Sequence, residues 1–345
     1  MSNRATARDV ARRAGVSRTT VSFVLNDVTG MRISPETRQR VLDAASELKY
    51  HPDVSARRLV SGRTQVIGYI ECQSTGQAFA DVFLPEVLRG LHEAVCDQGF
   101  HVLFEPIAPD QNSTDRYAQL IRERHVDGIV FSGPRFDNSD ELLRLHDEGV
   151  PVVLQGRLPG ASIPYVDVDN VGGARQAVEH LIALGHERIA LITNAPLVYT
   201  AAADRRAGYA GALQRAGIPV EPALMQTGSF SAQSGAAAMR DLLALPDRPT
   251  AVFVAGDTVA IGAIQAAREA GLRVPGDIAF VGFDDVPLAE YLDPPLTTIR
   301  LPAYGLGWGA AEALVRLING EELQTTEILF DTELIVRESC GVSRR

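Results

Sequence analysis

The sequence contains little of what secretion, membrane insertion or metal binding requires. Its 3 cysteines, Cys72, Cys96 and Cys340, form no CxxC pattern, so we expect isolated thiols and neither a disulfide nor a metal site. No apolar run reaches the length of a membrane span, and the arginine-rich N-terminus has no signal-peptide core. We therefore expect a cytoplasmic protein with no membrane partner.

Motifs of common enzyme classes are also missing. The chain has no GxGxxG turn, no P-loop, no GxSxG elbow, and no HExxH among its 7 histidines. Asp284 and Asp285 are adjacent, so in an extended segment they point in different directions and make a poor acid–base pair. We expect no metal, no cofactor and no enzymatic activity.

The charge is unevenly distributed along the 345 residues, a length that allows two or three domains. Residues 1–63 contain 12 Lys and Arg against 6 Asp and Glu, whereas the whole chain has a net charge of −10. A basic segment on an acidic body favours a DNA-binding head and discourages non-specific DNA contact elsewhere.

The segment from Thr6 to Asn26 has the pattern of two short helices joined by a tight turn. Thr6 and Ser17 can cap the two helices, and Gly15 supplies the permissive backbone of the turn. Apolar residues at helical spacing give each helix one face to bury, namely Val10, Ala11 and Ala14, then Val21, Val24 and Leu25. The pattern predicts a helix-turn-helix whose second helix enters the DNA major groove, with an ordinary helical hairpin as the alternative. Ser34-Pro35-Glu36 then marks the start of a third helix.

From Thr64 onward, apolar strand-like runs alternate with amphipathic helical patterns. The expected strands are 66–70, 102–104, 128–131, 152–154, 189–192, 251–254 and 278–281. The expected helices include 87–95, 174–184, 207–216 and 259–270. The runs are apolar on both faces, as strands of a covered parallel sheet must be, so the alternation predicts doubly wound sheets.

Polar residues that directly follow these strands are candidates for a binding site. Ser132, Asp257 and Asp284 each follow a predicted strand. Doubly wound sheets bind ligands beyond the carboxyl ends of their strands, so these side chains are expected to face a ligand. Asp257 also opens a helix, and the alternative is that it only caps that helix.

The sequence resembles the lactose-repressor/galactose-repressor family of bacterial transcriptional regulators over nearly its full length. The most specific segments are DVARRAGVSRTTVSFVLN, ISPETRQRVLDAASELKYHPD, VGFDD and ELIVRES. The resemblance implies an N-terminal all-α helix-turn-helix headpiece and an α/β core of two doubly wound parallel-sheet lobes, similar to a periplasmic binding protein. It implies a headpiece at 1–50, a hinge helix or linker at 51–63, an N-terminal lobe at 64–164 and 295–324, and a C-terminal lobe at 165–294 and 325–345.

The resemblance also implies a set of DNA contacts in the headpiece. The set comprises Thr6, Ser17, Arg18, Thr19, Ser22, Phe23 and Asn26. Arg18 and Thr19 occupy the base-reading positions, and arginine pairs well with guanine N7 and O6. Thr6, Ser22 and Asn26 are candidates for phosphate contacts. Phe23 stands where relatives have a polar residue, so it either touches a thymine methyl or packs against the headpiece.

In this family the segment after the headpiece is a hinge helix that enters the minor groove. Ala56 would allow close approach, and Leu59 matches a leucine that is wedged into the central base step. Arg57 and Arg58 would contact phosphates beside it. The alternative is a polar linker with an incidental leucine.

The family's effector pocket maps onto several residues of the core. Arg205 lies in an RxxG pattern and Asp284 in GFDD, and both positions hydrogen-bond ligand hydroxyls in the family. Phe83 and Phe230 match positions that line the pocket. The alternatives are a solvated helix residue for Arg205 and core packing for the two phenylalanines.

Two glycines depart from the family pattern, so the ligand is not carried over from the lactose repressor. Gly256 replaces an asparagine found in many relatives, and Gly156 stands where the lactose repressor has an aspartate. The residues and the resemblance together predict a homodimeric repressor of sugar-utilisation genes. A small molecule, expected to be a sugar, would release it from a palindromic operator or recruit it there. The alternative is a solute-binding protein for sugar uptake.

Overall fold

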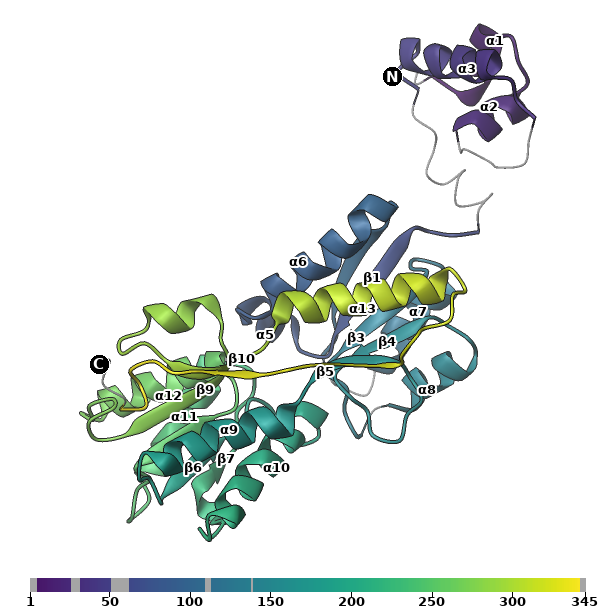
Figure 1. Ribbon diagram of the computed structural model, residues 1–345. Coiled ribbons are helices and arrows are strands. Elements are labelled where there is room, and N and C mark those ends of the chain that lie inside the picture. Colours follow the sequence, from purple (N-terminus) through teal and green to yellow (C-terminus); the bar gives the residue numbers. More distant parts are fainter. Residues whose placement is uncertain (1–4, 26–31, 51–61, 109–112, 138, 342–345) are drawn as a thin grey trace. The chain divides into compact units, whose positions relative to one another are not determined.

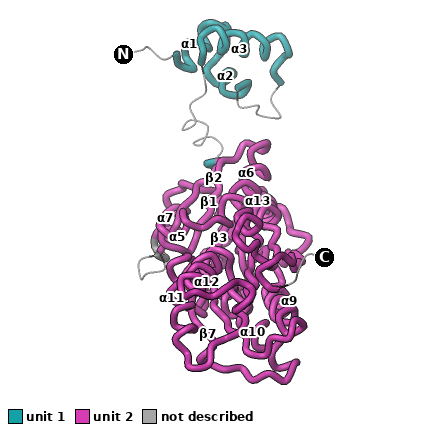
Figure 2. The backbone as a smooth tube through the Cα atoms, turned by 90° about the vertical axis from the view of Figure 1, so that its left-hand side faces the viewer, with its two compact units in different colours: residues 1–64 teal, residues 65–345 magenta. Residues whose placement is uncertain are grey.

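The computed structural model describes residues 5–25, 32–50, 62–108, 113–137 and 139–341 (Figure 1). The chain divides into two compact units, Met1–Thr64 and Gln65–Arg345, which are described separately (Figure 2). The first unit holds the helical headpiece and the second the α/β core, which confirms the predicted fold class.

The described part of the headpiece consists of α1 (Ala7–Ala14), α2 (Arg18–Leu25) and α3 (Pro35–Glu47). Small apolar side chains of all three helices meet in one buried cluster. It comprises Val10, Ala11, Ala14, Val21, Val24, Val41, Ala44 and Ala45. Because these side chains are small, the three helices can approach closely around a thin core.

The first lobe of the core contains a parallel sheet in the order β11-β5-β4-β3-β1-β2. Helices α6 and α13 lie side by side on one face of this sheet, and α7 and α8 cover the other (Figure 1). Its strands are β1 (Val66–Glu71), β2 (His101–Pro106), β3 (Gly128–Ser132), β4 (Val152–Gln155), β5 (Tyr165–Val168) and β11 (Glu327–Phe330). Its helices are α5 (Thr75–Ala80), α6 (Leu84–Val95), η1 (Cys96–Gln98), α7 (Ser113–Arg122), α8 (Asp140–Asp147) and α13 (Ala303–Ile318).

The second lobe has a sheet in the order β12-β10-β9-β8-β6-β7, in which β12 alone runs antiparallel to its neighbour. Helices α9 and α10 cover one face, and α11 and α12 cover the other. Its strands are β6 (Ile189–Ile192), β7 (Met225–Gln226), β8 (Ala251–Val254), β9 (Ala279–Asp284), β10 (Thr297–Arg300) and β12 (Glu333–Ile335). Its helices are α9 (Asn170–Ala183), α10 (Thr200–Arg215), η2 (Pro222–Leu224), α11 (Ala232–Leu243), α12 (Asp257–Glu269) and η3 (Pro287–Tyr291).

The chain crosses between the lobes later than the sequence predicted. The expected boundaries were 164/165, 294/295 and 324/325. However, β5 and β11 pair with each other in the first sheet, and β10 pairs with β9 in the second. The crossings therefore follow Val168, Arg300 and Phe330. Each expected boundary precedes a short strand, β5, β10 or β11, that belongs to the sheet of the lobe before the crossing.

Candidate functional site

The turn between α1 and α2 is built as the sequence predicted. Thr6 forms a capping box with Asp9, in which the Thr6 side chain accepts from the Asp9 amide. Gly15 has a left-handed backbone with φ of 69°, and Ser17 Oγ accepts from the amide of Thr20 at 3.0 Å. These local bonds fix where α2 begins, and α2 is the helix that carries the predicted base-reading residues.

The predicted DNA-contacting side chains lie on the outer face of α2. Ser17, Arg18 and Thr19 are exposed, while Ser22 and Phe23 are half-buried. The described apolar cluster of the headpiece does not include Phe23. Asn26, Ala56 and Leu59 lie outside the described residues, so their predicted DNA contacts stay predictions.

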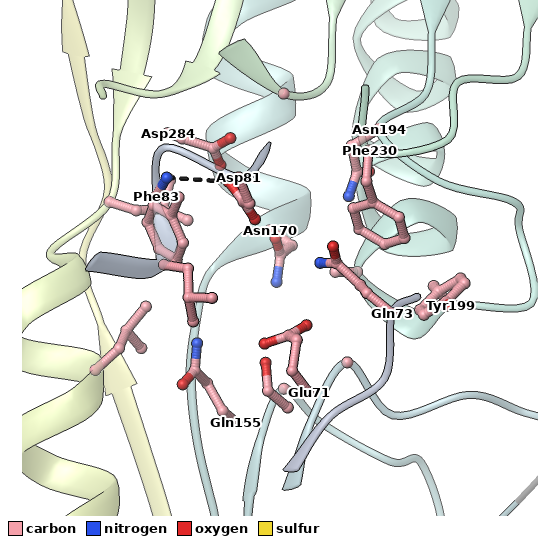
Figure 3. A pocket seen from close by; sticks show the side chains of 18 of the residues that line it. Glu71, Gln73, Asp81, Phe83, Gln155, Asn170, Asn194, Tyr199, Phe230 and Asp284 are labelled. Carbon is pink, nitrogen blue, oxygen red and sulfur yellow. Dashed lines mark hydrogen bonds between the residues drawn. The ribbon is translucent and has the colours of Figure 1, made fainter. Parts of the chain in front are cut away.

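A pocket opens between the two lobes of the core, at the carboxyl ends of their parallel strands (Figure 3). It contains about 1000 Å³ of space, part of which is open to solvent. Its position between two lobes and its mixed polar and aromatic lining suit a small-molecule ligand. Five of the six predicted effector-binding residues line it, namely Phe83, Ser132, Arg205, Phe230 and Asp284.

The second-lobe side of the pocket is organised by Arg205 and Asp284. Arg205 donates from Nε to Asn170 Oδ1 at 2.9 Å and from Nη1 to the carbonyl of Ala255 at 2.6 Å. It also lies 3.5 Å from Asp284 Oδ1 and over the ring of Phe283 at 3.8 Å. With 6% of its surface exposed, Arg205 is therefore not the solvated helix residue of the alternative interpretation.

The ionisation of this pair is shifted by burial. Burial lowers the pKa of Arg205, and the neighbouring Asp284 opposes that shift. Burial raises the pKa of Asp284 to about 7, although Arg205 favours its charged form. A carboxyl group and a guanidinium held together in this way present hydrogen-bonding groups to any ligand hydroxyl that enters.

Two pocket residues adopt a costly backbone conformation. Asp284 has φ of 119° and Phe230 has φ of 53°. Positive φ is unfavourable for residues with a side chain and is often found at functional sites. Both side chains line the cavity.

The prediction for Asp257 was wrong. Its side chain does not line the pocket, and it is completely buried. It accepts hydrogen bonds from the amides of Phe283 and Val286 at 2.9 and 3.1 Å and from the Thr298 hydroxyl at 2.8 Å. Asp257 is also not the helix cap of the alternative interpretation, since its side chain binds other segments. It holds the loop that carries Asp284.

The two phenylalanines combine the two roles that the sequence left open. Phe83 and Phe230 line opposite sides of the cavity (Figure 3), and both also pack against core clusters. Phe230 meets the ring of Tyr199 edge to face at 5.1 Å. Ser132 is buried at the end of β3. The cavity thus has aromatic side walls and polar ends.

Several polar lining residues were not predicted from the sequence. They are Glu71, Gln73, Asp81, Gln155, Asp167, Asn170, Asn194 and Tyr199. Glu71, Gln155 and Asn194 follow predicted strands, as Ser132 does, so the same positional rule would have found them. Asp81 and Tyr199 come from helix-flanking loops, for which the sequence gives no comparable signal.

Glu71 is an unusual group to bury. Its pKa is raised to about 7 because burial disfavours the charged carboxylate and Asp81 adds a second negative charge. The Tyr69 hydroxyl donates to it at 3.2 Å. In Figure 3, Glu71 and Gln155 lie at one end of the cavity and Asp284 lies at the other.

The two glycines that depart from the family pattern stand where a side chain fits poorly. Gly156 has φ of 108°, and a Cβ there would lie 2.8 Å from Pro134 Cδ. A Cβ on Gly256 would lie 3.0 Å from Asn194 Cβ. Both residues line the pocket. A side chain at either position would therefore change the shape of the pocket.

The described residues contain no group of three or more His, Cys, Asp or Glu side chains that could hold a metal ion. Within the same part of the chain, no helix is long and apolar enough to cross a membrane. The adjacent carboxylates point apart as expected: Asp284 faces Arg205, whereas Asp285 pairs with Arg300 and Arg337 at 2.7 and 2.8 Å.

Comparisons with known proteins agree with both halves of this description. Residues 6–53 match the family model for bacterial regulatory proteins of the lacI family, and residues 178–340 match that for a periplasmic binding protein-like domain. The HTH-type transcriptional regulator CelR of Thermobifida fusca is 37% identical over 342 residues, which cover 97% of this chain and 98% of CelR.

Two solved structures extend the likeness to the fold. A complex of transcriptional regulator CelR with cellobiose is 36% identical, with a TM-score of 0.74 and coverage of 97% of this chain and 100% of that one. The lac repressor dimer bound to operator and the anti-inducer ONPF is 29% identical, with a TM-score of 0.84 and coverage of 97% and 99%. The likeness includes the DNA-binding headpiece, so the solute-binding alternative is not favoured. The chain belongs to the lacI family of bacterial regulatory proteins and is a DNA-binding transcriptional regulator with a ligand-binding core.

Proposed function

We propose that this protein is a homodimeric repressor of sugar-utilisation genes whose affinity for operator DNA is set by a sugar bound between the lobes of its core. The observation that carries the proposal is the pocket, because its lining comes from both lobes. A ligand that touches both lobes changes the free energy of their relative positions. We place the protein in the cytoplasm, where it meets its operator.

We propose that α2 reads the operator. Arg18 and Thr19 are exposed near its start, where side chains of a recognition helix reach base edges. Thr6, Ser17, Ser22 and Asn26 would contact phosphates or neighbouring groups and set the register. Phe23 is outside the described apolar cluster of the headpiece, which favours contact with a thymine methyl.

The segment 51–63 would act as the hinge between headpiece and core. With Ala56 allowing close approach, Leu59 from each subunit would insert between the central base pairs and bend the duplex. The bend would bring both headpieces onto their half-sites. Two copies of one chain bind best to a site whose halves are related by the same two-fold symmetry.

We place the dimer contact on the first lobe. The apolar residues of α6, Val87 and Leu91 among them, are buried in their own lobe. The outward residues Arg89 and His92 of this helix are exposed and would face the partner.

The two lobes are joined by hydrogen bonds beside the pocket, and a bound ligand could change these contacts. The amide of Phe136 donates to the carbonyl of Val198 at 2.9 Å, and the Tyr199 hydroxyl donates to the carbonyl of Cys72 at 2.7 Å. Gln77 in α5 donates to Ser229 Oγ at 3.0 Å. We propose that Phe83, Ser132, Arg205, Phe230 and Asp284 contact the ligand and that its binding shifts these contacts. Such coupling is typically worth about 1–3 kcal/mol, and its sign depends on which state the ligand favours.

The DNA half of the proposal is tested by selecting duplexes from a random pool with the full-length protein. We expect an enriched site with two related half-sites. The variant Arg18→Ala should lose about 1–3 kcal/mol of affinity for that site and discriminate less at one base pair of each half-site. Enrichment of no sequence, or unchanged discrimination by Arg18→Ala, would contradict the proposal.

A further inference from the structure

We propose that Glu71 makes the inter-lobe pocket selective for an uncharged, hydroxyl-rich ligand and against the acidic counterpart of the same ligand. The inference rests on the proposed function and deepens it, because it names the ligand chemistry and the residue that selects it. Glu71 ends β1 on the first-lobe side of the pocket, and 6% of its surface is exposed.

At the end of the pocket around Glu71, one hydroxyl lies within hydrogen-bond distance of two acceptors. The Tyr69 hydroxyl lies 3.2 Å from Glu71 Oε2 and 3.1 Å from Gln155 Oε1. A phenol has one proton, so it can donate to only one of these oxygens at a time. Ser132 and Gln73 also hydrogen-bond to the Glu71 carboxylate, but its two oxygens offer about four acceptor positions. Acceptor capacity therefore remains for hydroxyls of a ligand.

Two further acceptors lie elsewhere on the lining. Gln73 Oε1 and Asn194 Oδ1 are buried and have no hydrogen-bond partner within the described part of the chain. They follow β1 and β6, which belong to different lobes. A buried acceptor without a donor is unfavourable, so a ligand that donates to both oxygens gains affinity. Donors at such separate points suit a polyhydroxylated molecule better than a single ammonium group.

The charge of the lining disfavours an anion. Its ionisable side chains include the carboxyls of Glu71, Asp81, Asp167 and Asp284 and the guanidinium of Arg205. Arg205 already lies 3.5 Å from Asp284, which offsets its attraction for an incoming carboxylate or phosphate. Glu71 has no ion-pair partner among the described residues and already lies near the carboxyl of Asp81, so the negative charge of an acidic ligand beside it would be unfavourable.

The test compares neutral sugars with acids of the same skeleton on the full-length protein by titration calorimetry at pH 7.5. The pairs are cellobiose with cellobionate, glucose with glucuronate, and ribose with ribose 5-phosphate. We expect a neutral member to bind and its acidic partner to bind at least roughly tenfold more weakly, a difference of about 1.4 kcal/mol. This arm needs no variant, so it does not depend on the folding of a mutant.

The second arm uses Glu71→Gln, which keeps the shape and removes the charge. We expect the ratio of the two dissociation constants to fall about tenfold in this variant. Glu105→Gln is the matched control. Glu105 lies on the adjacent strand β2, opposite Ile70, and pairs with Arg116 outside the pocket, so the ratio should not change.

Three results would overturn the inference: acids that bind wild type as tightly as the neutral sugars, an unchanged ratio in Glu71→Gln, or no binding of any neutral member. Failure of the proposed function looks different. It would appear as no selected operator, or as an operator affinity that a bound sugar does not alter.

Discussion

At the scale of single residues, Asp257 shows that a carboxylate beside a pocket can be a structural group. It follows β8 and opens α12, which is the position expected of a ligand contact. Its two oxygens are instead engaged with three donors of the strands and loop behind the pocket. The position of Asp284 therefore depends on Asp257, although Asp257 does not line the pocket.

We predict that Asp257→Asn destabilises the core without changing which ligands it binds. The new amide group would face the Val286 amide, so one buried donor loses its acceptor, at a cost of about 1–3 kcal/mol in the free energy of unfolding. Urea unfolding followed by circular dichroism measures the change. Asp241→Asn on the exposed side of α11 is the control and should change stability by less than about 0.5 kcal/mol. Unchanged stability together with lost binding would make Asp257 a ligand contact after all.

Glu71 should make the stability of the core depend on pH. Its pKa is raised from 4.5 to about 7 by burial and by Asp81, with Tyr69, Ser132 and Gln73 partly opposing the shift. Between pH 4.5 and about 7, Glu71 loses its proton in the unfolded chain but keeps it in the folded protein. Wild type therefore loses stability as the pH rises from about 4.5 to 7, and the penalty is complete above that range.

We predict that Glu71→Gln removes this penalty. The free energy of unfolding of the variant minus that of wild type should increase from pH 5 to pH 8, by at most about 3 kcal/mol. Urea unfolding of both proteins at several pH values measures the difference. A difference that stays constant across this range would mean that Glu71 does not carry the shift.

The sequence predicted the pocket better than it predicted its individual contacts. Ser132 and Asp284 were found because polar residues at the ends of buried strands face the same edge of a sheet. Asp257 also follows a buried strand, but its side chain does not line the pocket. It hydrogen-bonds instead with residues that are distant in the sequence. Asp81 and Tyr199 reach the pocket through loops whose path only the folded protein shows.

At the scale of elements, the first lobe depends on the close packing of α6 against α13. A Cβ on Gly90 would lie 2.1 Å from the carbonyl oxygen of Tyr304, and one on Gly307 would lie 2.0 Å from that of Val87. No side chain fits at either position unless the helices move apart. Each glycine therefore allows the backbone of its helix to approach that of the other.

We predict that Gly90→Ala destabilises the first lobe by about 1–3 kcal/mol, because the added methyl group forces α6 and α13 apart. The single tryptophan, Trp308, has its amide 3.0 Å from the position of that methyl, so its fluorescence reports the change during urea unfolding. Gly76→Ala in α5 is the control, since a Cβ there meets nothing within 4 Å. This control should be neutral or stabilising by up to about 1 kcal/mol. Equal stability of Gly90→Ala and wild type would contradict the packing described here.

The elements recovered from the sequence are the ones with a strong local signal. Every predicted strand of the core was found, because each is a continuous apolar run. The short strands β5, β7, β10, β11 and β12 were missed, since they are brief or alternate with polar residues. The crossings between lobes depend on these strands. The crossings were therefore misplaced for the same reason that these short strands were missed.

At the scale of the whole molecule, the ligand-binding core is one unit made of two lobes in contact. Tyr199 bonds to Cys72, and Gln77 bonds to Ser229, across the gap between the two sheets. The pocket lies beside these contacts and draws its lining from both lobes. Binding there can therefore change the balance between lobe arrangements by the difference in ligand affinity for each.

The central claim is that a sugar in this pocket changes operator affinity. We would titrate the full-length protein into a labelled selected operator with and without a saturating sugar, following fluorescence anisotropy. We predict a change in operator affinity of about 5- to 150-fold, the usual range for coupled sites. The change should disappear in Phe230→Ala, which removes one aromatic wall of the pocket. A sugar that binds the core but leaves wild-type operator affinity unchanged would contradict the account.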